Sequence, residues 1–200
     1  LSNVYVLLDF LSVLGMVSLA ELILLIGGEI DVSIPSQMAL VATIIALCNL
    51  NHIPTIISLV FTFITAIAIG SINGFFTAYI KLPSFLVTLA TSALLQGAVI
   101  LLTRYSALPI MDTTLINIFY GVRVAGTSID FVWFLAIMIV VMFMLKYTRF
   151  GRRIYAVGGN AFAVWCLGID IRKIKLELFI IASILTAIAG LILGARAQSA

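Results

Sequence analysis

The side chains that could do chemistry in this chain are few, and they do not form a recognised catalytic set. The one histidine, His52, lies in a short polar turn. Neither a Ser–His–Asp set nor an HExxH metal motif can be built around it, and the phosphate-binding pattern GxxxxGK(S/T) is absent. We therefore expect no catalytic residue, no metal site, no cofactor and no ATP binding by this chain itself.

Acidic residues within apolar sequence are the next candidates, because a charge at membrane depth is expensive unless it is paired or hydrated. These residues are Glu21, Glu29 and Asp31. The last two lie in GGEIDVSIPS (residues 27–36), where two glycines let a helix unwind and Ser33 or Ser36 could cap the next helix. This break either faces a cavity or gate inside the membrane or is a hydrated turn at the interface, and the sequence leaves both open.

A polar face runs along the apolar stretch 84–103 and consists of Thr88, Ser92, Gln96 and Thr103. Asn73 is the odd polar residue of the preceding apolar stretch. Uncharged hydroxyls and amides can donate and accept hydrogen bonds, which suits a path for a neutral, hydroxyl-rich solute. The same groups also join neighbouring helices. Our candidates for a translocation path are Asp31, Asn73, Thr88 and Gln96.

One basic island, residues 146–175, interrupts the apolar sequence. It holds seven of the chain's 11 Lys and Arg residues: Lys146, Arg149, Arg152, Arg153, Arg172, Lys173 and Lys175. Lys and Arg beside membrane segments resist translocation, so the island is predicted to face the cytoplasm. Its GGN at 158–160 is a turn signal, and the amphipathic AFAVWCLGI that follows predicts a short helix across the end of a bundle. Such a helix either docks a soluble partner or only fixes the topology.

Composition assigns the chain to the membrane class. Of its 200 residues, 64% are hydrophobic and 10% are charged, whereas a soluble domain is about half apolar and a quarter charged. The net charge of +3 arises beside membrane segments, so we expect lipid surroundings and no nucleic-acid partner.

Six apolar stretches predict membrane segments, at about 4–26, 36–50, 54–80, 84–103, 131–147 and 176–196. With the basic island inside, alternation places the turn at 81–84 inside and the stretches 49–52 and 104–130 outside. The break at 27–35 lies near the inner side or dips into the bilayer. Cys48 and Cys166 then lie on opposite sides of the membrane, so no disulfide joins them.

Stripes of small residues mark two of these segments as packing surfaces, since small side chains four residues apart let helices approach closely. One stripe is Thr62, Ala66, Gly70, Gly74 and Ala78, and the other is Ser183, Ala187, Gly190 and Gly194. They predict a compact helical bundle.

Four stretches resemble the permease subunits of bacterial ABC importers for monosaccharides, the ribose-type permease family. GEIDVSIPS (28–36) is similar to that family's GIDLSVGS, and NGFFTAYIKLPSFLVTLAT (73–91) to its NG…LP.F.VTL signature. TRFGRRIYAVGGN (148–160) with LGIDIRKIK (167–175) resembles its cytoplasmic loop, and LTAIAGLILGARAQSA (185–200) resembles the following helix. The resemblance covers nearly the whole chain.

The resemblance implies an all-α, polytopic transmembrane helix bundle in the bacterial cytoplasmic (inner) membrane. Residues 1–200 would form a single permease domain, with a coupling loop at about 148–174. Family members have about ten helices, so the six segments would be the second to the seventh and the chain would be truncated at both ends. The implied partners are cytoplasmic ABC ATPase subunits, which hydrolyse ATP on separate chains, an extracytoplasmic sugar-binding protein and a second permease subunit. The coupling-loop residues would be Arg149, Gly151, Arg152, Gly158, Gly159 and Asn160.

The chain departs from the family pattern at two places. Pro35 stands where the family usually has glycine, so the backbone of the break is expected to differ. Phe162, Val164 and Trp165 replace positions that are often acidic, alanine or arginine, so recognition of the ATPase is expected to be specific to this protein's own partner.

We predict that the chain moves a monosaccharide, a ribose-like pentose or a hexose, inward by alternating access. The first alternative is an ABC permease for another solute: a branched-chain amino acid, a nucleoside or a signalling sugar. The second is a membrane protein that does not transport, such as an intramembrane enzyme or a scaffold. A charged solute calls for a committed charge in the path, and an enzyme calls for a reactive set of side chains.

Overall fold

The computed structural model describes residues 2–121, 123–124 and 127–198. Its main elements are the helices α1 (Ser2–Ile26), α2 (Ile34–Leu50), α3 (Thr55–Ala78), α4 (Ser84–Thr103), α6 (Ile129–Tyr147), α7 (Arg149–Cys166) and α8 (Ile171–Ala197). Between α4 and α6 lie a helical turn, α5 (Thr113–Ile116), a π-helix, η1 (Asn117–Gly121), and two paired antiparallel strands, β1 (Arg123–Val124) and β2 (Thr127–Ser128). The predicted all-α class is confirmed.

Membrane-length helices dominate the described part of the chain. Five of its helices are long and apolar enough to cross a membrane: α1 from Leu7, α3, α4, α6 and α8. The sixth predicted segment, α2, has 17 residues and is therefore about 25 Å long at 1.5 Å per residue. A hydrocarbon core is about 30 Å thick and spanning helices have about 17 to 25 residues, so α2 lies at the short end of that range. The chain is a multi-pass membrane protein.

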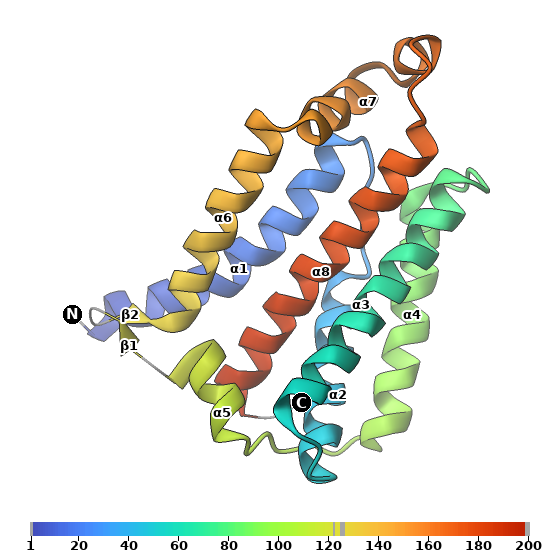
Figure 1. Cartoon of the computed structure of the whole chain (residues 1–200). Helices are drawn as coiled ribbons and strands as arrows, with labels where there is room; N and C mark the ends of the chain where they lie inside the picture. Colours follow the sequence, from blue (N-terminus) through green and yellow to red (C-terminus); the bar gives the residue numbers. More distant parts are fainter. Residues whose placement is uncertain (1, 122, 125–126, 199–200) are drawn as a thin grey trace.

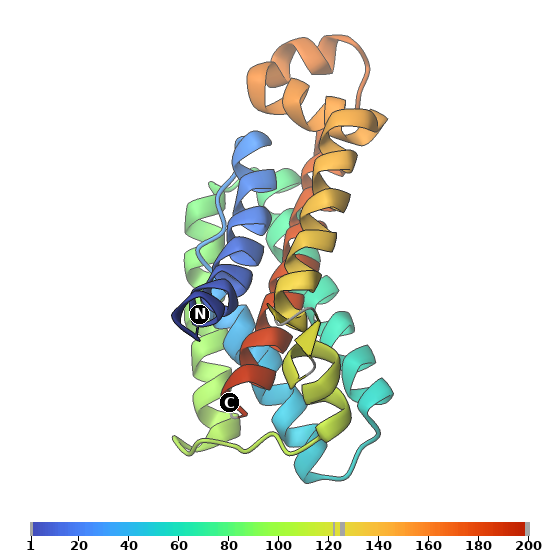
Figure 2. The same cartoon turned by 90° about the vertical axis from the view of Figure 1, so that its left-hand side faces the viewer.

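Helix α8 occupies the centre of the bundle, with α1, α2 and α3 packed around it. Its Leu178, Phe179 and Ala182 are fully buried. Helix α4 lies at the edge and buries only Val87, Thr88 and Ser92. Helix α7 lies across one end of the bundle in both views (Figures 1 and 2), and we call this the α7 end.

The small-residue stripes are packing surfaces, as predicted. A Cβ atom at Gly70 would lie 2.7 Å from the Phe179 carbonyl oxygen, so α3 and α8 meet backbone to backbone. A Cβ at Gly190 would lie 3.0 Å from the Cα of Met38, which shows the same close approach between α8 and α2. Van der Waals contact at this range is a main source of helix association in lipid.

An extended strap, residues 27–33, joins α1 to α2. Helix α1 ends at the α7 end, and the strap then turns back along the bundle before α2 begins (Figure 1). Gly28 makes this reversal possible, because its φ of +79° is a conformation that side-chain-bearing residues rarely adopt. The break therefore runs back along the helices of the bundle, and its depth in the bilayer stays a prediction. Pro35 lies in the first turn of α2, where its missing N–H is harmless.

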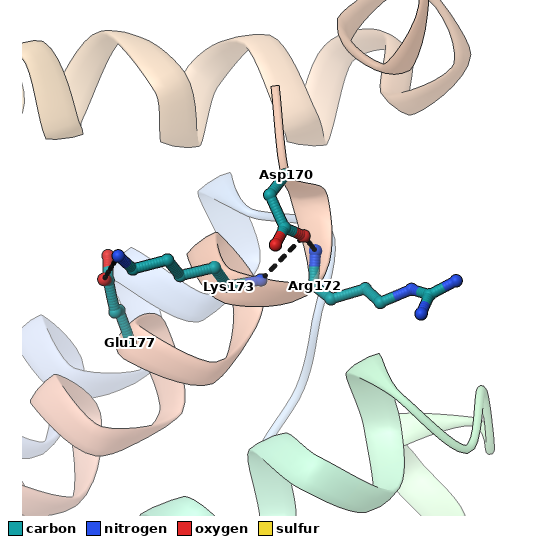
Figure 3. A network of polar contacts seen from close by, with 4 residues as sticks. All are labelled: Asp170, Arg172, Lys173 and Glu177. Carbon is teal, nitrogen blue, oxygen red and sulfur yellow. Dashed lines mark hydrogen bonds and ion pairs between the residues drawn. The ribbon is translucent and has the colours of Figure 1, made fainter. Parts of the chain in front are cut away.

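The predicted loop at 148–174 is largely helical. It contains all of α7 and the first turn of α8, so Arg172, Lys173 and Lys175 lie on α8 and not in a loop. Asp170 begins α8 by accepting hydrogen bonds from the backbone N–H groups of Arg172 and Lys173, at 3.0 and 3.3 Å (Figure 3). This N-cap explains why the helix starts within the basic island.

The two cysteines are well separated, as predicted. Cys166 is exposed at the end of α7, whereas Cys48 is buried near the opposite end of α2.

Candidate functional site

The strap carries its backbone through the bundle with every N–H from Glu29 to Ser33 paired. Glu29 N–H donates to the Leu24 carbonyl (2.9 Å), Ile30 N–H to the Ser84 hydroxyl (3.2 Å) and Asp31 N–H to the Glu21 carboxylate (3.4 Å). Val32 N–H donates to the Thr88 hydroxyl (3.1 Å) and Ser33 N–H to the Asp31 carboxylate (2.7 Å). Non-helical backbone is tolerated at membrane depth only when protein or water satisfies it. The polar side chains of α1 and α4 are therefore the partners that allow the strap to exist.

Asp31 lies at the centre of a buried polar network and is 4% exposed. Its Oδ1 accepts a hydrogen bond from the Ser33 hydroxyl, and its Oδ2 accepts one from Nε2 of Gln37 at 3.3 Å. Asn73 on α3 donates to the Ser33 hydroxyl at 3.2 Å, and Thr91 on α4 donates to the Asn73 carbonyl at 2.7 Å. One network thus joins the strap, α2, α3 and α4.

A second polar group joins the first turn of α2 to α4. The hydroxyls of Ser36 and Ser92 are 2.8 Å apart, and Gln96 donates to Ser36 at 3.2 Å. These bonds hold α2 against α4. Within the described residues, the Gln37 Oε1 atom is buried and accepts no hydrogen bond. A solute hydroxyl that entered the network around Asp31 could donate a hydrogen bond to this atom.

The structure brings the four predicted path residues together around the strap and the first turns of α2. Asp31 and Asn73 share the first network, Gln96 belongs to the second, and Thr88 accepts from the strap. Ser33 is the N-cap residue of α2, but its hydroxyl donates a hydrogen bond to Asp31 and makes no capping bond to the helix. Their role in a path stays a prediction. The described contacts show Asp31, Asn73 and Thr88 positioning the strap, and Gln96 joining α2 to α4.

Helix α7 is amphipathic and bent. Its Ile154, Val157 and Val164 are buried, whereas Phe162 and Trp165 are 72% and 66% exposed. The predicted turn is present as a kink at Asn160, whose φ of −155° and ψ of 91° are not helical. The Asn160 side chain accepts a hydrogen bond from the N–H of Ala163 at 3.0 Å and so starts the second half of the helix.

The glycines of α7 differ in what surrounds them. A Cβ at Gly158 would lie 1.8 Å from the Ile26 carbonyl oxygen at the end of α1, and a Cβ at Gly151 would lie 2.3 Å from the Leu145 carbonyl oxygen at the end of α6. Gly159 has nothing within 4 Å of the same position. Of the predicted coupling glycines, Gly151 and Gly158 therefore hold close backbone contacts, and Gly159 faces open space.

The predicted coupling arginines are placed differently from these glycines. Arg149 and Arg152 are exposed on α7, and Arg152 donates to the Tyr147 carbonyl at 3.5 Å. Their guanidinium groups are therefore available on the outer surface of the α7 end.

A buried ion pair ties the strap to α8. Glu29 in the strap binds the ammonium group of Lys175, and the two side chains are 7% and 25% exposed. Sequence reasoning left open whether Glu29 faces a cavity or a hydrated interface, and it did not identify this partner. Together with the Gly158–Ile26 contact, the pair means that α7, α8 and the strap meet at the α7 end.

The arrangement is a network of buried, hydrogen-bonded polar side chains. Among the described residues, no group of three His, Cys, Asp or Glu side chains could hold a metal ion. The described polar atoms instead form a buried network that reaches from the strap to three helices. A family model described as branched-chain amino acid transport system / permease component matches residues 4–200. The chain belongs to this family of permeases.

The curated relatives of this permease are named as sugar or ABC transporter permeases. The ribose import permease protein RbsC of Haemophilus influenzae is 32% identical over 182 residues, covering 89% of this chain and 56% of the relative. The xylose transport system permease protein XylH of Escherichia coli K12 is 26% identical over 255 residues, covering 97% and 65%. The probable ABC transporter permease protein YphD of the same strain is 27% identical over 186 residues, covering 93% and 56%.

The permease chain thus spans between 56% and 65% of the length of these relatives. No solved structure matches it.

Proposed function

We propose that this chain is the membrane permease part of an ABC importer for a monosaccharide in the bacterial cytoplasmic membrane. The observation that carries the proposal is the similarity over 89% or more of the chain to permeases named for ribose and xylose. The substrate is then a neutral, hydroxyl-rich solute such as a pentose or hexose. The uncharged hydroxyl and amide groups beside the strap are compatible with such a solute.

The α7 end faces the cytoplasm in this proposal, because the basic island would resist translocation. Two ATPase subunits of separate chains bind there, and a sugar-binding protein delivers the solute at the opposite side. The exposed pair Phe162 and Trp165, with ring centroids 5.9 Å apart, is the docking surface for the ATPase. A second permease subunit completes the path.

Movement reaches the membrane through the contact between Gly158 and the end of α1. When ATP closes the ATPase dimer, α7 is displaced and pushes the end of α1, which begins the strap. The strap carries the displacement to Asp31 and its network, where a change in the hydrogen bonds opens the path to one side or the other. Nucleotide drives the change only by favouring one of the two bundle states.

A branched-chain amino acid is the second candidate, since the family model is described by that solute. An amino acid brings an ammonium group, which the Asp31 carboxylate could bind, and a carboxylate, which needs a cation. The described residues around Asp31 supply a carboxylate and uncharged groups, and no Lys or Arg bonds to them. This set of groups favours a sugar.

Transport by the full-length protein tests the proposal directly. The permease is reconstituted in liposomes with the ATPase and binding protein encoded beside it, and uptake of labelled ribose, xylose and leucine is measured with and without ATP. We expect ATP-dependent uptake of a sugar and none of leucine. Uptake of leucine alone would replace the sugar by an amino acid, and an absence of any partner-dependent uptake would contradict the importer function.

A further inference from the structure

A cavity of about 810 Å³ opens at the α7 end, beside the site described above. It lies between the turn that joins α3 to α4 (residues 79–83), the connection from α7 to α8 (residues 167–170) and the first turn of α8. Its volume is in the range of small-molecule binding pockets, about 300–1,000 Å³. The coupling route through Gly158 does not use it.

The charges that line this cavity do not cancel. Lys81, Arg172 and Lys175 line it together with Glu29 and Asp170. Glu29 is already paired with Lys175, and Asp170 is engaged by backbone N–H groups at the start of α8.

Two cations therefore remain, since no described side chain forms an ion pair with Lys81 or Arg172. Figure 3 shows the Arg172 side chain extended away from Asp170, on the opposite side from the pair formed by Lys173 and Glu177.

Two free cations at a concave site call for an anion. The planar guanidinium of Arg172 can present two parallel N–H donors to a phosphate, and the Lys81 ammonium adds a second charge from across the cavity. A carboxylate and a phosphodiester each offer two charged oxygens, but the tetrahedral phosphodiester lets Arg172 and Lys81 approach those oxygens from different sides. The chemistry of the lining therefore matches a phosphate group.

The surroundings of the cavity identify the source of the phosphate as a lipid. Leu82, which lines the cavity, is 40% exposed, and Phe85 and Leu86 in the first turn of α4 are 54% and 57% exposed. Tyr79, a residue type that membrane proteins place at the headgroup level, lines the cavity itself. A lipid with its headgroup in the cavity would lay its acyl chains along this apolar surface, whereas a soluble phosphate would use the charges alone.

We propose that the cavity binds the headgroup phosphate of an anionic phospholipid, with the lipid's acyl chains lying along the exposed face of α4. Arg172 and Lys81 hold the phosphate, and the pair formed by Glu29 and Lys175 closes the cavity floor. Basic pockets between membrane helices bind anionic headgroups in the same way. The bound lipid thus bridges the turn after α3 and the start of α8, next to the strap.

Binding of phosphatidylglycerol by the purified full-length protein, measured by native mass spectrometry, tests this site. Each basic contact to an anionic lipid contributes about 1 kcal/mol, or about a fivefold change in affinity. We expect Arg172→Gln and Lys81→Gln each to weaken binding about fivefold, and the double variant about thirtyfold. Lys173→Gln removes a neighbouring charge that is 68% exposed and paired with Glu177, so it should change binding less than twofold.

Competition measurements distinguish a lipid phosphate from a soluble phosphate. Phosphatidylcholine should bind more weakly than phosphatidylglycerol, and glycerol phosphate or inorganic phosphate should not compete at millimolar concentration. Competition by inorganic phosphate would overturn the lipid in favour of a free anion. Equal losses of affinity for Arg172→Gln and Lys173→Gln would also contradict the proposal. So would release of the lipid when ATPase is added, because the ATPase would then cover the site.

Discussion

Gly158→Ala is the sharpest perturbation that the structure offers. The added Cβ would lie 1.8 Å from the Ile26 carbonyl oxygen, and contacts under 3.0 Å are essentially never seen for real Cβ atoms. Helix α7 must therefore retreat from the end of α1 by at least 1.2 Å, the difference between these two distances. Backbone atoms stand on both sides of this contact, so no rotamer change relieves it.

Overpacking of this kind costs about 1–3 kcal/mol. If the strain falls on the bundle state in which α7 presses on α1, the equilibrium between the two states shifts by about 5- to 150-fold. We expect ATP-dependent uptake by the full-length complex to fall by a factor in that range, while ATP hydrolysis continues. The assay compares uptake and phosphate release in the same liposomes.

Gly159→Ala is the matched control, because its added Cβ meets nothing within 4 Å. The neighbouring substitution has the same chemistry on the same helix, and we expect uptake within twofold of the unmodified protein. Equal loss in both variants would refute the contact and leave only a general effect on α7. Full uptake in Gly158→Ala would refute the route from α7 to the strap.

Three further predictions follow from the same geometry. A cysteine placed at the exposed position Ala161, in a protein without its native cysteines, should react with an impermeant thiol reagent in inverted vesicles and not in intact spheroplasts; labelling in spheroplasts would reverse the orientation. Thr88→Val leaves a strap N–H unpaired and should lower the free energy of unfolding by about 1–3 kcal/mol, whereas Thr65→Val, whose hydroxyl bonds only within its own helix, should change it by less than about 0.5 kcal/mol. Lys175→Met leaves the buried Glu29 carboxylate without its partner and should lower the free energy of unfolding by about 3 kcal/mol, the low end of the usual range, since the lysine is 25% exposed. Adding Glu29→Gln should restore most of that loss. A double variant as unstable as the single one would contradict the pairing.

The sequence predicts the helices of this chain well, because membrane helices are set by length and apolar content. The segment predicted at 84–103 coincides with α4, and the paired glycines before Glu29 correctly indicate a break. The turn signal at residues 158–160 becomes the kink at Asn160. Each of these features depends on residues close together in the chain.

The contacts that join the site depend on residues far apart, and single residue types do not reveal them. Glu29 and Lys175 are 146 positions apart, and several other basic residues would satisfy the same charge rule. Gly158 and Gly159 are identical in type, and only the packing of α7 on α1 distinguishes them. The helical start at Ile171 did carry a local signal, since Asp170 precedes it as an N-cap residue.

Crosslinking from α7 in the assembled transporter is the most direct test of the central claim that α7 receives the ATPase. A photoreactive amino acid replaces Phe162, which is 72% exposed on α7, and a second version carries it at Leu101, which is 80% exposed near the far end of α4. The account predicts an adduct with the ATPase subunit from position 162 and none from position 101. An adduct between position 162 and the sugar-binding protein, or the same ATPase yield from both positions, would contradict it.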